Sequence, residues 1–343
     1  MTEAARPERC SRRQALVWSL AGTARAACGS AGALASVSWA QTPTWPFKSV
    51  KLVVAYPPGG VSDHVARLLA ERLAQRLNLA VVVENKAGAS GALGVSAVAK
   101  SAPDGATLVF SALSPLTLSP HLGKPLLDPL QDIAPVSGVM TSPVLLLATT
   151  ATPINDFKGM LAAAKAQPGG WRWATSGAAS LGHVMLEQLR AAAQVDFTHI
   201  PYKGGGQYIS DALSAQFELL SVNSSAAVLQ HIQAGKLRAV AVGSPSRLAS
   251  LPQVPTLAEC GFAAANLSSH FGVFAPGGTP AAMLAQWNAE IQAVLSQPAL
   301  RERLSSAECI PLKTSVAEFS RSVAQEYEAM GRIVKAARIV GES

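Results

Sequence analysis

Short apolar runs alternate with amphipathic segments along the chain from about residue 50 onward. Three early runs of five or six residues are typical of buried strands, and they lie at 50–55, 80–84 and 107–111. The segments between them, 62–77 and 91–100, predict helices. In the first of these helices Val65, Leu68, Leu69 and Leu73 fall along one stripe.

The same alternation restarts further along the chain. Predicted strands lie at 142–148, 171–175, 197–200, 217–222, 237–242 and 271–275. Predicted helices lie at 157–166, 176–193, 226–234, 280–295 and 315–337, with another beginning near 202. Such alternation indicates βαβ units and a mixed, mostly parallel sheet in an α/β fold. The two series and a return segment predict two lobes, the first from 41–142 with 262–343 and the second from 143–261.

The first 40 residues resemble a cleaved export signal. Arg12 and Arg13 form a twin-arginine pattern before a weakly apolar stretch, and small residues precede an expected cut after Ala40. Twin-arginine signals usually carry Phe where this chain has Ala15, so both the Tat and the Sec routes stay open. The alternative is an Ala-rich tail that is never cut. Export would place the mature chain in the periplasm.

Composition narrows the function classes. The chain of 343 residues is 49% hydrophobic and 14% charged, which suits a large buried core. Its formal charge of +7 falls to +4 without the leader, and no Lys/Arg run remains, so we expect no nucleic-acid partner. Cys260 and Cys309 are the two cysteines left after cleavage, and they could pair or stay as separate buried thiols. The spacing of Cys and His predicts no metal and no cofactor.

Four predicted strand-to-helix junctions are rich in glycine and hydroxyl side chains. They lie at 57–63, 87–94, 175–183 and 202–207. Each places free backbone N–H groups at a helix start, where the helix dipole favours an anion. Glycine also allows the backbone to approach a ligand closely. Because ligands of open α/β sheets bind at the carboxyl ends of strands, these loops predict a carboxylate or phosphate site between the lobes.

Enzyme signatures are missing from the sequence. It contains no P-loop, no G-x-S-x-G elbow and no H-E-x-x-H motif. The remaining enzymatic alternative is a hydrolase that uses Ser90 or Ser176 with His183, which no motif supports. His183 could instead touch a ligand from its place at a helix start, whereas Asp63 could cap its helix or frame the site.

Seven segments carry a specific resemblance to a known family. They read Tyr-Pro-Pro-Gly-Gly-Val-Ser-Asp at 56–63, Val-Val-Val-Glu-Asn-Lys-Ala-Gly-Ala-Ser-Gly at 81–91, Ala-Pro-Asp-Gly at 102–105, Ile-Pro-Tyr-Lys-Gly-Gly-Gly at 200–206, Ala-Gly-Lys-Leu-Arg-Ala at 234–239, Leu-Pro-Gln-Val-Pro-Thr at 251–256 and Phe-Ala-Pro-Gly-Gly-Thr-Pro at 274–280. From about residue 46 to 338 the chain resembles the Bug-type receptors, the periplasmic binding components of tripartite tricarboxylate transporters.

This resemblance implies a type II periplasmic-binding-protein fold with a hinged ligand cleft, and a monomer that closes on a small carboxylate and docks on membrane permease subunits. The carboxylate would be a di- or tricarboxylate, an acidic amino acid or an aromatic acid. The family's binding positions map onto Tyr56, Gly59, Gly60, Ser62, Asp63, Ala87, Gly88, Ala89, Ser90, Ser111, Ser114, Thr175, Ser176, His183, Tyr202, Lys203, Gly204 and Gly205.

Two departures from the family pattern bear on the ligand. Val222 stands where relatives often carry a polar or acidic residue, and Ala178 with Ala179 replaces common polar residues. Both favour an apolar second-lobe wall and disfavour an amino-acid ligand. Lys203 is the best candidate for a side-chain cation, although it could equally be a solvated loop residue. A receptor that signals to a membrane kinase remains the alternative to transport.

Overall fold

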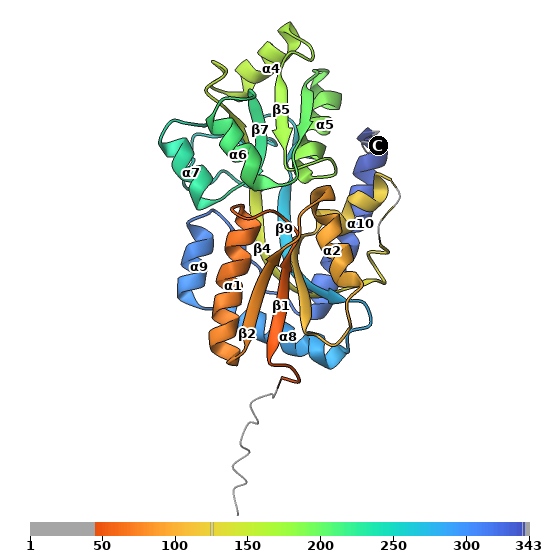
Figure 1. Ribbon diagram of the computed structural model, residues 1–343. Helices are drawn as coiled ribbons and strands as arrows, with labels where there is room; N and C mark the ends of the chain where they lie inside the picture. Colours follow the sequence, from red (N-terminus) through yellow and green to blue (C-terminus); the bar gives the residue numbers. More distant parts are fainter. Residues whose placement is uncertain (1–44, 124, 126, 338, 340–343) are drawn as a thin grey trace, which may run out of the picture. The chain divides into compact units, whose positions relative to one another are not determined.

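The structure is a computed structural model that describes residues 45–123, 125, 127–337 and 339, and Trp45–Ser343 forms one compact unit. The predicted export signal and its cleavage site lie outside the described residues. Figure 1 shows a sheet whose helices gather in two groups along its strands. We call the part with β1 and β2 the first lobe and the part with β5 and β7 the second lobe.

The first lobe begins with parallel strands. Its early elements are β1 (Ser49–Val54), α1 (Val61–Leu77), β2 (Ala80–Asn85), the 3₁₀ turn η1 (Ala89–Gly91), α2 (Ala92–Ala99), β3 (Thr107–Ala112), α3 (Ser114–Thr117) and η2 (Ser119–His121). Its late elements are β9 (Ser268–Pro276), α8 (Ala281–Leu295), α9 (Pro298–Ser305), β10 (Ile310–Pro311) and α10 (Val316–Ala337). The strands are ordered β2-β1-β3-β9-β4, and β9 is antiparallel to both of its neighbours.

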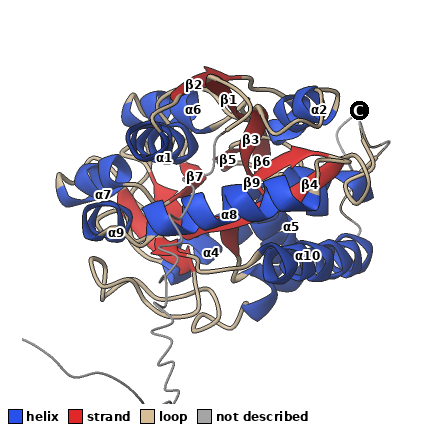
Figure 2. Cartoon of the chain, turned by 90° about the horizontal axis from the view of Figure 1, so that it is seen from below, coloured by secondary structure: helices blue, strands red, loops and turns tan. Residues whose placement is uncertain are grey.

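Side-chain alternation along β1 divides the first-lobe core into two layers. Leu52 and Val54 pack with residues of α1, α8 and α9, whereas Val53 packs on the opposite face with residues of α2 and α10. Figure 2, viewed from below, accordingly shows α1 and α9 on one side of the strands and α2 and α10 on the other. Helices therefore cover both faces of this sheet, as its parallel strands require.

One long strand, β4 (Ile133–Ala148), belongs to both lobes. Residues 133–143 pair with β9 in the first lobe, and residues 144–148 pair with β7 and β8 in the second. The sequence predicted a strand only at 142–148, whereas β4 extends back to Ile133 and includes Pro135, Ser137 and Gly138. Register shifts between Pro135 and Ser137, and again after Gly138, absorb these residues as bulges.

The second lobe repeats the layered arrangement. Its elements are α4 (Phe157–Ala166), β5 (Arg172–Thr175), α5 (Leu181–Ala193), β6 (Thr198–Pro201), α6 (Gly205–Leu213), β7 (Leu219–Asn223), α7 (Ala226–Gln233), β8 (Arg238–Gly243) and η3 (Ala263–Ala265). On β4, Leu146 packs with residues of α4 and α5, and Leu147 packs on the other face with residues of α6 and α7. The exact residue ranges of the two lobes stay a prediction.

The last helix, α10, contributes to the cores of both lobes. Phe319 and Val323, near its start, pack in the first-lobe layer with α2, whereas Met330 and Val334 pack with α4 and α5 of the second lobe. Between these ends, Glu326 accepts hydrogen bonds from Thr117 of α3 at 3.0 Å and pairs with His270 of β9 at 2.8 Å. The helix is therefore a link between the lobes in addition to β4.

The two described cysteines are free thiols. Cys309 is buried in the first-lobe core, and Cys260 packs at the margin of a second-lobe cluster. Burial raises the pKa of the Cys309 thiol to about 11, which keeps it protonated at neutral pH. Within the described ranges, no helix has the length and hydropathy to cross a membrane, and no group of three or more His, Cys, Asp or Glu side chains is arranged to hold a metal ion.

Candidate functional site

A cavity of about 50 Å³ lies where the lobes meet. It has room for only a few water molecules, so the lobes are in a closed arrangement and a ligand would enter by their separation. The lining residues come from both lobes. They are Tyr56, Gly60, Val61, Ser62, Ser90, Ala112, Ser114, Val144, Ser176, Ser180, Leu181, Gly182, Gly205, Tyr208, Ser221, Asn223, Ser269 and Phe271.

Two helices start at this cavity with glycine caps. Gly60 precedes α1 and Gly204 precedes α6, and neither helix has a side-chain cap hydrogen bond. Backbone N–H groups in a first helical turn have no partner within the helix, so they remain available to a ligand. Because Gly60, Val61 and Gly205 line the cavity, these donors and the positive ends of two helix dipoles favour a carboxylate there.

The cavity wall itself is electrically neutral. Its polar members are serine and tyrosine hydroxyls and the amide of Asn223, and its apolar members include Val144, Leu181 and Phe271. Within this wall the Tyr208 hydroxyl donates to the Ser221 carbonyl at 3.0 Å. The site can therefore hold an anion through dipoles and hydroxyls while its apolar side accepts a hydrocarbon segment.

Asp63 shapes the first loop, and it does not line the cavity. Its carboxylate accepts hydrogen bonds from Gly59 N–H at 3.1 Å, Arg67 Nε at 3.0 Å and Asn85 Nδ2 at 2.8 Å. Burial alone would raise the pKa of Asp63, but these hydrogen bonds outweigh burial and lower it. The ionised carboxylate thus fixes Gly59, whose φ of +85° suits glycine.

Glycines allow the lobes to approach backbone to backbone. A Cβ on Gly204, whose φ is +139°, would lie 2.2 Å from Pro57 Cδ, and a Cβ on Gly206 would lie 2.8 Å from the Pro58 carbonyl oxygen. The Ser90 hydroxyl donates to the carbonyl oxygen of Ala178 in the opposite lobe. Side chains at these positions would hold the lobes apart, so closure of the two lobes requires glycine there.

Seven of the residues predicted for the site line the cavity together: Tyr56, Gly60, Ser62, Ser90, Ser114, Ser176 and Gly205. The other eleven lie outside the lining: Gly59, Asp63, Ala87, Gly88, Ala89, Ser111, Thr175, His183, Tyr202, Lys203 and Gly204. Lys203 is exposed, and Tyr202 donates from its hydroxyl to Asp211 at 2.7 Å. Burial and the Asp211 carboxylate raise the pKa of Tyr202 to about 12. Direct ligand contact by any of these residues stays a prediction.

Strand residues of the lining were missed by the sequence analysis. Ser221 and Asn223 point into the cavity from β7, and Ser269 and Phe271 do so from β9. The sequence does show that side chains alternate between the two faces of these strands. It does not tell which of the two faces meets the cavity. The same alternation buries Val222 in the second-lobe core, so the identity of that residue does not bear on the ligand.

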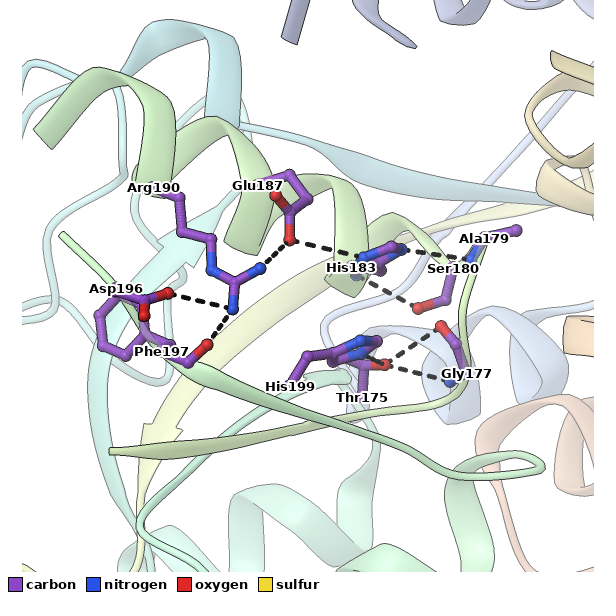
Figure 3. Close-up of polar contacts among 10 residues, drawn as sticks. All are labelled: Thr175, Gly177, Ala179, Ser180, His183, Glu187, Arg190, Asp196, Phe197 and His199. Atoms are coloured by element: carbon purple, nitrogen blue, oxygen red, sulfur yellow. Dashed lines mark hydrogen bonds and ion pairs between the residues drawn. The ribbon is translucent and has the colours of Figure 1, made fainter. Parts of the chain in front are cut away.

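His183 and His199 lie behind the loop at 175–180 (Figure 3). Their rings are stacked, with centroids 4.3 Å apart and an angle of 2° between the ring planes. Nδ1 of His183 accepts from Ala179 N–H at 3.4 Å, and Nε2 faces Glu187 Oε1 at 3.6 Å. The partners of both ring nitrogens of His183 are therefore Ala179 and Glu187 and neither Ser90 nor Ser176, which argues against the serine–histidine pair that a hydrolase would need.

Two α/β lobes around a neutral cavity at helix starts are characteristic of the periplasmic solute-binding proteins. Comparisons with known structures confirm this fold class. The structure matches periplasmic binding protein BugD with a TM-score of 0.82 and 29% identity, covering 87% of this chain and 100% of BugD. The R. palustris protein Rpa4515 with adipate gives a TM-score of 0.82 at 29% identity and coverages of 87% and 99%. MatC from Rhodopseudomonas palustris with bound malate gives 0.78 at 27% identity, with coverages of 84% and 99%.

Sequence comparisons identify the family. The model of the tripartite tricarboxylate transporter family receptor matches residues 65–339. Protein BugT of Bordetella pertussis is 34% identical over 313 residues, which cover 89% of this chain and 93% of BugT. The chain therefore belongs to the tripartite tricarboxylate transporter receptor family, and the resemblance to Bug-type receptors is confirmed. Members of this family are periplasmic binding receptors.

Proposed function

We propose that this protein is an extracytoplasmic receptor that binds one small carboxylate, catalyses no reaction and delivers its ligand to the permease subunits of a tripartite transporter. The observation that carries the proposal is the cavity between the lobes, where the uncapped starts of α1 and α6 meet serine hydroxyls. Relatives of the same fold hold adipate and malate, which are both dicarboxylates.

The lining also indicates which carboxylates fit. A ligand ammonium group would need an acidic partner, and the lining described above offers hydroxyl, amide and backbone groups in place of a carboxylate. Apolar contacts from Val144, Leu181 and Phe271 suit a hydrocarbon or aromatic portion. We therefore expect dicarboxylates and aromatic acids to bind more tightly than amino acids of the same length.

Isothermal titration calorimetry with adipate, malate, benzoate and glutamate tests this proposal. One-to-one binding of at least one of the first three acids, tighter than that of glutamate and without turnover, is the expected result. Ser176→Ala should weaken it, because the Ser176 hydroxyl lines the cavity. Ser210→Ala, at an exposed position of α6, is the matched control and should leave affinity unchanged. No binding of any carboxylate, or glutamate as the tightest ligand, would refute the proposal.

Periplasmic location, a monomeric state and delivery to a permease complete the proposal. Uptake of a labelled ligand by cells with and without the permease genes distinguishes delivery from signalling. Uptake that depends on both the receptor and the permease supports transport. Binding without any effect of the permease genes on uptake would favour a sensor. The mass of the exported protein would establish cleavage after Ala40, and its export in Tat-deficient cells would assign the Sec route.

A further inference from the structure

The loop at 175–180 is held in an unusual backbone shape at the ligand cavity. Ser176 and Ser180 line the cavity, and the Ala178 carbonyl accepts the Ser90 hydrogen bond from the opposite lobe. Gly177 has φ +138° and Ala179 has φ +62°, and the second value is unfavourable for a residue with a Cβ. A strained shape of this kind persists only where surrounding groups stabilise it.

Two histidines supply that support from behind the loop (Figure 3). His183, which is only 4% exposed, accepts the Ala179 N–H on Nδ1 at 3.4 Å. His199 Nε2 lies 2.8 Å from Thr175 Oγ1, and this hydroxyl in turn accepts the Gly177 N–H at 3.2 Å. The imidazoles thus hold the loop at Ala179 and at Gly177.

The contacts of His183 define its protonation state. A nitrogen that accepts a hydrogen bond carries no proton, so the neutral ring has its proton on Nε2, toward Glu187. A second proton would have to be added at Nδ1, directly opposite the Ala179 N–H. Two donors would then face each other, and the hydrogen bond that holds the loop would be lost.

Charged groups around His183 come from its own helix and from the β6 segment. Arg190 of α5 pairs with Glu187 and with Asp196 at 3.4 Å, and it donates to the Phe197 carbonyl. Burial would raise the pKa of Glu187, but hydrogen bonds from His183 and the charge of Arg190 lower it, so Glu187 is ionised. Glu187 attracts the Nε2 proton, whereas the stacked His199 opposes a full positive charge on both rings.

We propose that His183 is a positioning residue whose Nδ1, as the acceptor for the Ala179 N–H, keeps the 175–180 loop in its ligand-binding shape. Ligand affinity therefore falls when this acceptor is removed. This inference rests on the proposed carboxylate-binding function. It assigns His183 a role behind the loop in place of the direct ligand contact expected from the sequence.

The test is the affinity for adipate and malate, measured by calorimetry at one pH in the wild type and in variants of His183. His183→Asn places an amide oxygen near the position of Nδ1 and so keeps an acceptor for the Ala179 N–H. It should bind like the wild type.

Two further variants separate positioning from folding. His183→Ala removes the acceptor and leaves one backbone donor unsatisfied, so it should bind roughly tenfold more weakly. His231→Asn, in α7, should bind like the wild type. Wild-type affinity in His183→Ala, or the same loss in His183→Asn as in His183→Ala, would overturn the inference while leaving carboxylate binding intact.

A measurement without ligand makes the inference independent of the ligand chosen. Nitrogen-15 NMR of the imidazole should show the His183 proton on Nε2, and the Ala179 amide signal should shift in His183→Ala and stay near its wild-type position in His183→Asn. A proton on Nδ1, or an Ala179 signal that is unchanged in His183→Ala, would overturn the proposed positioning. Failure of every carboxylate to bind would instead reject the proposed function.

Discussion

A methyl group added at Gly206 would test whether the lobes meet in the ligand-bound protein as they do in this structure. Gly206 lies in the first turn of α6, and a Cβ built there would lie 2.8 Å from the carbonyl oxygen of Pro58 in the opposite lobe. That oxygen belongs to the backbone, so no side-chain rotation relieves the contact. The substitution Gly206→Ala should therefore oppose closure.

The size of the effect follows from that distance. Ordinary contact begins near 3.4 Å, so the lobes would have to separate by about 0.6 Å at this point. A gap of that size forfeits roughly a quarter to a half of the dispersion energy of each atom pair it affects. Insertion of a methyl group into a packed contact costs about 1–3 kcal/mol. We therefore expect affinity to fall roughly fivefold to 150-fold.

The thermal stability of Gly206→Ala, unlike its affinity, should not fall. Replacement of glycine by alanine inside a helix stabilises it by about 0.5–1 kcal/mol, so Gly206→Ala should melt at the wild-type temperature or slightly above it. Calorimetric titration with adipate and malate measures the affinity, and thermal denaturation measures the stability. Ser210→Ala, on the exposed side of the same helix, gives a similar helix stabilisation without a contact across the lobes and serves as the control.

Two outcomes would refute this reasoning. Affinity within twofold of the wild type would show that the approach of Gly206 to Pro58 is absent from the ligand-bound form. A large loss of thermal stability would show that Gly206 is needed by the fold itself, and the lower affinity would then say nothing about closure.

Three further results are expected. Ser90→Ala removes the hydrogen bond to Ala178 across the lobes and should weaken carboxylate binding roughly fivefold in calorimetry, whereas unchanged affinity would exclude this bond from the bound state. Trp287→Ala should lower the free energy of unfolding in denaturant by about 3–5 kcal/mol, because the indole is fully buried and its N–H is hydrogen-bonded at 3.0 Å; a loss below about 1 kcal/mol would contradict that packing. The hydrogen bond that His270 donates to the Glu326 carboxylate raises the pKa of His270, so this pair stabilises the fold below the ordinary histidine pKa of about 6.5 and ceases to do so as pH rises through the raised value. Glu326→Gln should thus lower the melting temperature more at pH 5.5 than at pH 8, with a difference below about 1 kcal/mol because the His270 side chain is 44% exposed; an equal effect at both pH values would contradict it.

The hydrophobic periodicity of the sequence predicted most of the helices and strands, because their buried residues do recur with the period of the backbone. The helix expected at 157–166 is present as Phe157–Ala166, with Phe157, Met160 and Ala164 on its buried side. The helix expected from 176 begins only at Leu181, because the backbone at 176–180 follows the cavity. Its start is set by Ser180, whose hydroxyl accepts the His183 N–H at 3.2 Å.

The sequence predicted only part of the site. Glycine-rich loops can be recognised in a sequence, whereas the sequence does not tell which face of a strand meets the cavity. Ser62, Ser90 and Ser176 were found from their loops and do line the cavity. Ser221 and Ser269 depend on which strands become neighbours, and β4 pairs with β7 and β9, which lie far apart in the sequence. Asp63 and His183 were predicted for the site from the sequence, but only the hydrogen bonds show that they support loops.

The anchoring of α10 in both lobes has a consequence for how this receptor can evolve. Met330 and Val334 are each more than nine-tenths buried against the second lobe, and full burial of one such side chain stabilises by about 1.5–3 kcal/mol. Replacements along this helix can therefore shift the balance between open and closed forms without touching the cavity. Apparent affinity follows the population of the binding-competent form. Binding strength can thus also be adjusted at positions outside the cavity, so natural selection can change it while it conserves the residues that line the ligand site.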